Sequence, residues 1–152
     1  MDISIMEMLA QHEETISDLY SAYSKQFPEH REFWATLAWE ENDHARQIRE
    51  LEIEVKNNHA AFDSTAIKGI VIEKSLEYVK NQTVEAQKKG ILLARALSVA
   101  LDIEKSVIDG EFFDAFKGFT AKSRKLIREL GNEVQEHYKI IEAKWTEHRR
   151  YA

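Results

Sequence analysis

The chain has 152 residues, of which 43% are hydrophobic and 32% charged, with one proline, five glycines and a formal net charge of −6. This length suits a single domain over residues 1–152, and the low proline and glycine content predicts an all-α protein. The absence of cysteine excludes disulfides, thiolate metal sites and thiol catalysis. The acidic balance and the lack of a basic stripe argue against nucleic-acid binding.

Apolar residues recur at helical spacing along five stretches of the chain, which predicts five helices. These helices span about residues 4–25, 28–56, 66–89, 91–116 and 120–150. No stretch is long and apolar enough for a membrane span, and no secretory signal is apparent, so we expect a cytoplasmic protein that does not contact membranes.

The ends of the predicted helices carry recognisable signals. Ser4 and Glu7 have the spacing of a capping box, and Pro28 suits the first turn of a helix. Gly90 and Gly118 separate the later helices. Short links then make antiparallel hairpins of the first two helices and of the last two.

The helix at about 66–89 connects the two hairpins. It is long enough to carry the chain from one end of a bundle to the other. A four-helix bundle with one long helical crossover between its second and third helices is the ferritin-like topology. We therefore expect a ferritin-like four-helix bundle.

The two hairpins share residue spacings, which suggests an internal repeat. Leucine, histidine and isoleucine recur at equal separations in the second and the last predicted helix, as Leu37, His44 and Ile48 and as Leu130, His137 and Ile141. Glu13 precedes His44 by 31 residues, and Glu104 precedes His137 by 33. A metal on a pseudo-twofold axis would receive similar ligands from each half, although any two helical hairpins share some spacings.

Carboxylates and histidines fall on the apolar faces of these helices. Glu41 and His44 emerge one turn apart on one face of the second helix, and Glu13 flanks the stripe of the first. Glu104 lies in the middle of the apolar stripe of the helix at about 91–116, and His137 belongs to the last helix. Because burying an unpaired carboxylate is costly, this layout predicts a metal site in the bundle core. Glu40 lies further round the second helix and is interpreted as a surface acid.

The last helix departs from the pattern of a carboxylate three residues before the histidine. Val134 occupies that position before His137, and valine cannot bind a metal. Glu133, one residue earlier, lies at the edge of the stripe. Either Glu133 turns inward as a substitute ligand, or water or hydroxide fills the gap, or the second metal position is lost.

Three segments resemble the rubrerythrin branch of the ferritin-like superfamily: residues 13–20 (EETISDLY), 37–45 (LAWEENDHA) and 101–105 (LDIEK). The resemblance implies a carboxylate-bridged di-iron centre that reacts with peroxide or oxygen. The family's ligand positions are matched by Glu13, Glu41, His44, Glu104 and His137. Val134 replaces a bridging glutamate, and Val107 stands where rubrerythrin often has a second acid. The chain lacks a cysteine-rich rubredoxin tail, so redox activity would need an external electron donor.

Two functional hypotheses remain open. The first is a metalloprotein, with iron the first choice and manganese or zinc as alternatives, in which Tyr20 or Tyr23 lies near the metal. The second is a metal-free or single-metal structural or interaction module that has lost the di-iron chemistry. Trp39 and Ile53 lie on the far side of the second helix, where they either cover the crossover helix or form a homodimer interface.

Overall fold

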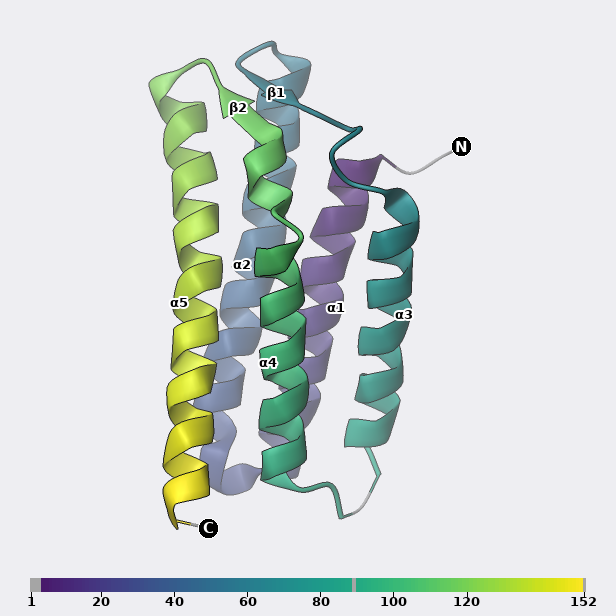
Figure 1. The fold of residues 1–152 in the computed structure, drawn as a ribbon, viewed down its shortest axis with the longest axis vertical. Coiled ribbons are helices and arrows are strands. Elements are labelled where there is room, and N and C mark those ends of the chain that lie inside the picture. Colours follow the sequence, from purple (N-terminus) through teal and green to yellow (C-terminus); the bar gives the residue numbers. More distant parts are fainter. Residues whose placement is uncertain (1–3, 89, 152) are drawn as a thin grey trace.

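The computed structural model describes residues 4–88 and 90–151 of the chain (Figure 1). Long α-helices account for most of it, and their bounds are α1 Ile5–Gln26, α2 Arg31–Lys56, α3 Gly69–Ala86, α4 Leu93–Asp109 and α5 Ala121–Tyr151. Two short 3-10 helices, η1 (Pro28–His30) and η2 (Phe112–Ala115), lie in the connections. The all-α prediction is confirmed, and none of the described helices is long and apolar enough to cross a membrane.

Local sequence signals account for the helix ends. The hydroxyl of Ser4 accepts a hydrogen bond of 3.0 Å from the backbone N–H of Glu7, as the capping-box spacing predicts. At the end of α2, Asn58 adopts a left-handed conformation with φ of 62°, which asparagine tolerates better than most residues. Gly90, with φ of 87°, supplies the turn between α3 and α4.

The helices pack as two hairpins with α3 on the outside. α1 packs along α2, α4 packs along α5, and α2 contacts α5 across the middle of the bundle. α3 runs beside α1 and returns the chain from one end of the bundle to the other (Figure 1). Because α3 packs on α1, it leaves Trp39 and Ile53 of α2 uncovered, with 69% and 55% of their surface exposed. The interpretation that these two residues cover the crossover helix is therefore wrong.

A short two-stranded sheet closes one end of the bundle, where the sequence had indicated only helix and loop. β1 (Ala60–Phe62) pairs antiparallel with β2 (Phe116–Gly118), and the rings of Phe62 and Phe116 lie 4.7 Å apart. The predicted helix over residues 91–116 therefore ends early, at Asp109. Glu111 then adopts φ of 51°, which breaks the helix before the strand begins.

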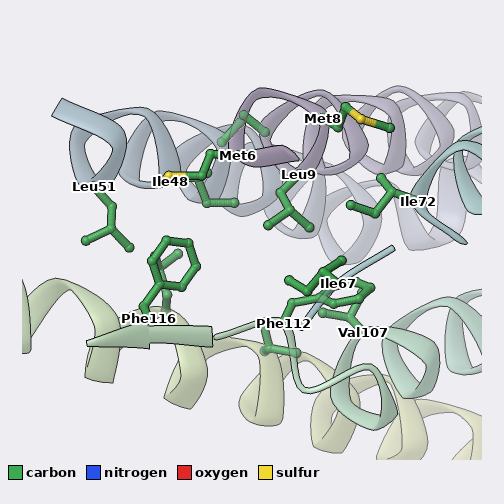
Figure 2. Packing of buried hydrophobic residues seen from close by; sticks show 14 of the residues in the cluster. Met6, Met8, Leu9, Ile48, Leu51, Ile67, Ile72, Val107, Phe112 and Phe116 are labelled. Carbon is green, nitrogen blue, oxygen red and sulfur yellow. The ribbon is translucent and has the colours of Figure 1, made fainter. Parts of the chain in front are cut away.

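Apolar side chains form two clusters along the bundle. The sheet-end cluster, shown in Figure 2, includes Met6, Leu9, Ile48, Leu51, Phe112 and Phe116. The far-end cluster includes Ile16, Tyr20, Trp34, Leu97 and Ile141. Burial of these side chains is the main stabilising contribution to the fold, at roughly 25 cal/mol per Å² of apolar surface removed from water. Between the two clusters, each of the helices α1, α2, α4 and α5 has a short interval that carries buried polar side chains.

Candidate metal centre

Buried ionisable side chains fill the interval between the sheet-end and far-end clusters. On α1, Glu13 lies between Ala10 of the first cluster and Ile16 of the second. The same interval on the other bundle helices holds Glu41 and His44 on α2, Glu104 on α4 and His137 on α5. Each of these side chains is at most 4% exposed. The helices thus bring together the five residues on which the predicted site depends.

Glu41 lies at the centre of this group and faces both imidazoles. Its Oε1 is 2.8 Å from Nδ1 of His137, and its Oε2 is 3.5 Å from Nδ1 of His44. The two imidazole rings lie 4.8 Å apart between centroids. Glu41, His44 and His137 each offer a ligand atom within 4.8 Å of the others. This buried Glu/His/His group could hold a metal ion.

Glu13 and Glu104 lie beside Glu41 and share its buried environment. Burial raises the pKa of Glu13 well above its usual value, and the charge of Glu41 and a hydrogen bond with it raise it further. Burial and the charge of Glu41 raise the pKa of Glu104 to about 7, although His137 opposes the shift. The hydroxyl of Tyr20 donates a hydrogen bond of 2.9 Å to Oε1 of Glu104. The expected tyrosine neighbour is therefore Tyr20, whereas Tyr23 packs against Trp34.

Glu41 and the histidines respond to each other's charge. Burial would raise the pKa of Glu41, but hydrogen bonds with Glu13 and His137 and the charge of His44 lower it well below its usual value. Burial lowers the pKa of His137, but the neighbouring carboxylates of Glu104 and Glu41 outweigh this effect and raise it to about 11. In His44, burial is likewise outweighed by Glu41, so its pKa is raised. Without a metal, these shifts favour the ionised forms of Glu41 and His137 and the protonated form of Glu13.

The donor set fits a metal cation. Carboxylate oxygens and imidazole nitrogens are ligands that iron, manganese and zinc accept. Nδ1 of His44 is buried and makes no hydrogen bond, although it faces Glu41. A buried polar atom without a partner is costly, and a cation between this nitrogen and the carboxylates would remove that cost.

Glu133 lies on the outer side of His44. Its Oε2 is 2.8 Å from Nε2 of His44, the ring nitrogen that does not face Glu41. Val134 is buried in the sheet-end cluster and borders a cavity of about 100 Å³ together with Val107 and Gly131. Val134 itself offers no ligand, and the acids that line this cavity, Glu111 and Asp114, do not belong to the Glu/His/His group.

Glu40 and His12 complete the surroundings of the site. Glu40 is only 37% exposed, and its Oε2 lies 2.5 Å from Nε2 of His137, so its interpretation as a plain surface acid is wrong. The signal that could have revealed it is a glutamate four residues before each histidine, Glu40 before His44 and Glu133 before His137. Next to Glu13 on α1, Nε2 of His12 contacts the hydroxyl of Ser75 on α3 at 2.7 Å.

Comparisons with family models, with curated proteins and with solved structures find no match to this chain. The function is therefore inferred from the geometry and chemistry of the site.

Proposed function

We propose that this protein is a ferritin-like metal-binding protein whose carboxylate and histidine ligands hold iron. The observation that carries the proposal is the convergence of Glu13, Glu41, His44, Glu104 and His137, from four helices, in one buried layer. Such a layer costs free energy unless its charges are compensated. A cation provides that compensation and gives the unpartnered Nδ1 of His44 a partner.

The arrangement of helices supports the ferritin-like part of the proposal. Two hairpins, α1–α2 and α4–α5, contribute one pair of helices each, and the long helix α3 joins them. In bundles of this class, ligands come from facing helices and project into the core. The carboxylates and imidazoles of this chain project into the core in the same way.

The ligands divide between two metal positions. Glu13, Glu41 and His44 would hold one ion, while Glu104 and His137 would hold a second ion more weakly, because Val134 supplies no ligand. Glu41 faces both imidazoles and would be available to both positions. Bound iron would supply reactivity towards oxygen or peroxide, with electrons from an external donor. The donor set also accepts manganese or zinc.

A second candidate function is a structural or interaction module that binds no metal or a single ion. The observation that favours it is the pairing already present between Glu41 and His137, whose Oε1 and Nδ1 lie 2.8 Å apart. Burial and the charge of Glu41 also raise the pKa of Glu13, which favours its neutral form. Val134 adds apolar surface where a bridging ligand is expected. A network of this kind is stable without a cation when every member finds a partner.

Metal analysis separates the two candidates. Protein purified without chelator is examined for iron, manganese and zinc, and chelated protein is then titrated with each ion under anaerobic conditions. We expect at least one ion per chain, and loss of that ion in Glu41→Gln but not in Glu136→Gln, which changes an exposed glutamate one residue before His137. Equal metal content in the wild type and Glu41→Gln would refute the proposed site.

A further inference from the structure

Two half-exposed glutamates hold the outer nitrogens of the buried imidazoles. Glu40 of α2 contacts Nε2 of His137 on α5 at 2.5 Å, and Glu133 of α5 contacts Nε2 of His44 on α2 at 2.8 Å. Each helix thus supplies the carboxylate that binds the histidine of the other helix. We call these two contacts the carboxylate clasp.

The clasp has the same spacing in both helices. Glu40 precedes His44 by four residues, and Glu133 precedes His137 by four residues, so each acid lies about one turn before the histidine of its own helix. α2 and α5 run in opposite directions (Figure 1). One turn towards the N-terminus therefore leads to opposite ends of the bundle, and the two acids lie on opposite sides of the imidazole pair.

Exposure distinguishes the clasp from the inner carboxylates. Glu40 and Glu133 are 37% and 41% exposed, whereas both imidazoles are 2% exposed. These acids keep contact with solvent, and Oε2 of Glu133 is buried 2.8 Å from Nε2 of His44, in a charge contact that lacks hydrogen-bond geometry. Nε2 of His137 is hydrogen-bonded to Glu40, and because a carboxylate can only accept a hydrogen bond, this nitrogen must carry the proton. Nε2 of His44 faces Glu133 at ion-pair distance, which favours a proton on the same ring nitrogen. Nδ1 is then the ring nitrogen available inside the bundle.

We propose that Glu40 and Glu133 are positioning residues, which hold the two imidazoles by Nε2 so that both Nδ1 atoms face Glu41 and bind the metal. This inference rests on the proposed function and deepens it. A carboxylate on the second ring nitrogen fixes the orientation of a metal-bound histidine and increases its basicity. It also gives Glu133 a role on the outer side of His44 instead of the role of substitute ligand beside Val134.

The first test uses nitrogen NMR of the metal-free protein, so it does not depend on metal binding. The variants are Glu40→Ala, Glu133→Ala and, as a control, Glu136→Ala, which removes an exposed glutamate from α5. We expect Glu40→Ala to shift the Nε2 and Hε2 signals of His137 while those of His44 stay in place. Glu133→Ala should do the reverse. If the His137 signals do not change in Glu40→Ala, or the His44 signals do not change in Glu133→Ala, the clasp is overturned.

The second test measures affinity for Zn²⁺ and Fe²⁺ by chelator competition. We expect each alanine variant to lose about 10- to 100-fold in affinity, as is typical when the outer partner of a metal-bound histidine is removed. Glu40→Gln and Glu133→Gln, which keep an acceptor oxygen, should recover part of the loss. The alanine variants could instead lower only the melting temperature and leave the affinity within threefold of the wild type. In that case the clasp only stabilises the packing of α2 against α5, and the positioning role is wrong.

The two tests distinguish the failure of this inference from the failure of the proposed function. If the wild type binds none of the ions, the proposed function fails, and the NMR comparison still decides whether the clasp orients the rings. If the wild type binds metal but the variants match it, the proposed function stands and this inference fails.

Discussion

The hairpin α1–α2 and the hairpin α4–α5 place matching residues around the site but differ at one inner position. The matching pairs are Glu13 and Glu104, His44 and His137, and the clasp acids Glu40 and Glu133. At the remaining position the first hairpin has Glu41 and the second has Val134. The first hairpin therefore supplies the central carboxylate, which faces the imidazoles of both halves.

Because of this difference, Glu41 and Val134 have different surroundings and different roles in the two hairpins. Val134 extends the sheet-end cluster and adds apolar contact, whereas Glu41 lies in the polar layer. Stability and metal binding make opposite demands on this position, because a buried carboxylate is costly unless it is compensated. In the proposed site, Glu41 of the first hairpin serves as a ligand, whereas Val134 of the second hairpin packs in the sheet-end cluster.

The largest effect is expected when the first half is made to resemble the second. Glu41→Val removes the carboxylate that both imidazoles face, and we expect the affinity for metal to fall by at least about 100-fold, beyond the loss typical of outer partners. The metal-free variant should stay folded, because apolar replacement of a buried charged group is often tolerated. Metal content and circular dichroism check both expectations. Glu50→Val, on the exposed side of α2, is the control, and an equal loss there would contradict the interpretation.

The reverse change should restore the missing ligand in the second half. Val134→Glu places a carboxylate one turn before His137, beside a cavity of about 100 Å³ that leaves room for a larger side chain. We expect the second ion to bind about 10- to 100-fold more tightly, so that titration gives two ions per chain. The metal-free variant should be less stable than the wild type, because it buries another acid.

Val134→Gln is the matched control for this change, since it has nearly the same size but no charge. It should leave the second position as weak as in the wild type. Equal stoichiometry in the glutamate and glutamine variants would show that position 134 does not limit the second ion.

Helical periodicity made the long helices and the inner ligand candidates accessible from the sequence alone. The start of α1 followed from Ser4 and Glu7, and the apolar stripes placed Glu41 and Glu104 inward. The end of α4 could not be predicted in this way, because Phe112 and Phe116 continue the apolar pattern after the helix has stopped. Strands of three residues are too short to show a period of their own.

The carboxylate clasp also escaped the sequence pattern, for a physical reason. A helical wheel describes one helix at a time, and on α2 it places Glu40 outside the apolar stripe. The partner of Glu40 is His137, which belongs to α5 and is 97 residues away in the chain. Only the packing of α2 against α5 brings the two together. Contacts between helices therefore decide the role of a residue at the edge of a stripe.

A smaller effect concerns the residue before the first acid, where the hairpins differ again. His12 precedes Glu13, whereas Ile103 precedes Glu104. Burial lowers the pKa of His12 to about 4 from an ordinary value of 6.5, although the charge of Glu41 opposes the shift. The unfolded chain therefore binds a proton between about pH 6.5 and 4 that the folded chain rejects. Stability is complete above this range and is lost as the pH falls through it.

Substitution of this histidine tests the argument. From pH 7 to pH 5, His12 alone should lower the free energy of unfolding by about 2 kcal/mol. His12→Ile, which copies the second hairpin, should lack this part of the acid sensitivity, whereas His30→Gln should keep it. Urea unfolding of metal-free protein at both pH values measures the difference, because acid would also release a bound metal. Parallel loss in the wild type and His12→Ile would contradict the assignment.

The smallest effect separates the hairpins by their surface ion pairs. Arg49 of α2 contacts Glu7 and Glu14 of α1 at 2.9 and 2.7 Å, whereas between α4 and α5 the described residues pair charges only at the buried site. These side chains are all partly exposed, so we expect Arg49→Ala to cost only about 0.5–1 kcal/mol. Arg46→Ala, whose partners lie on its own helix, should cost less. The difference between the two variants should vanish in about 1 M salt, because salt screens exposed charges. A difference that persists in salt would mean that Arg49 acts through the packing of its aliphatic stem across α1 and α2, and not through its charge.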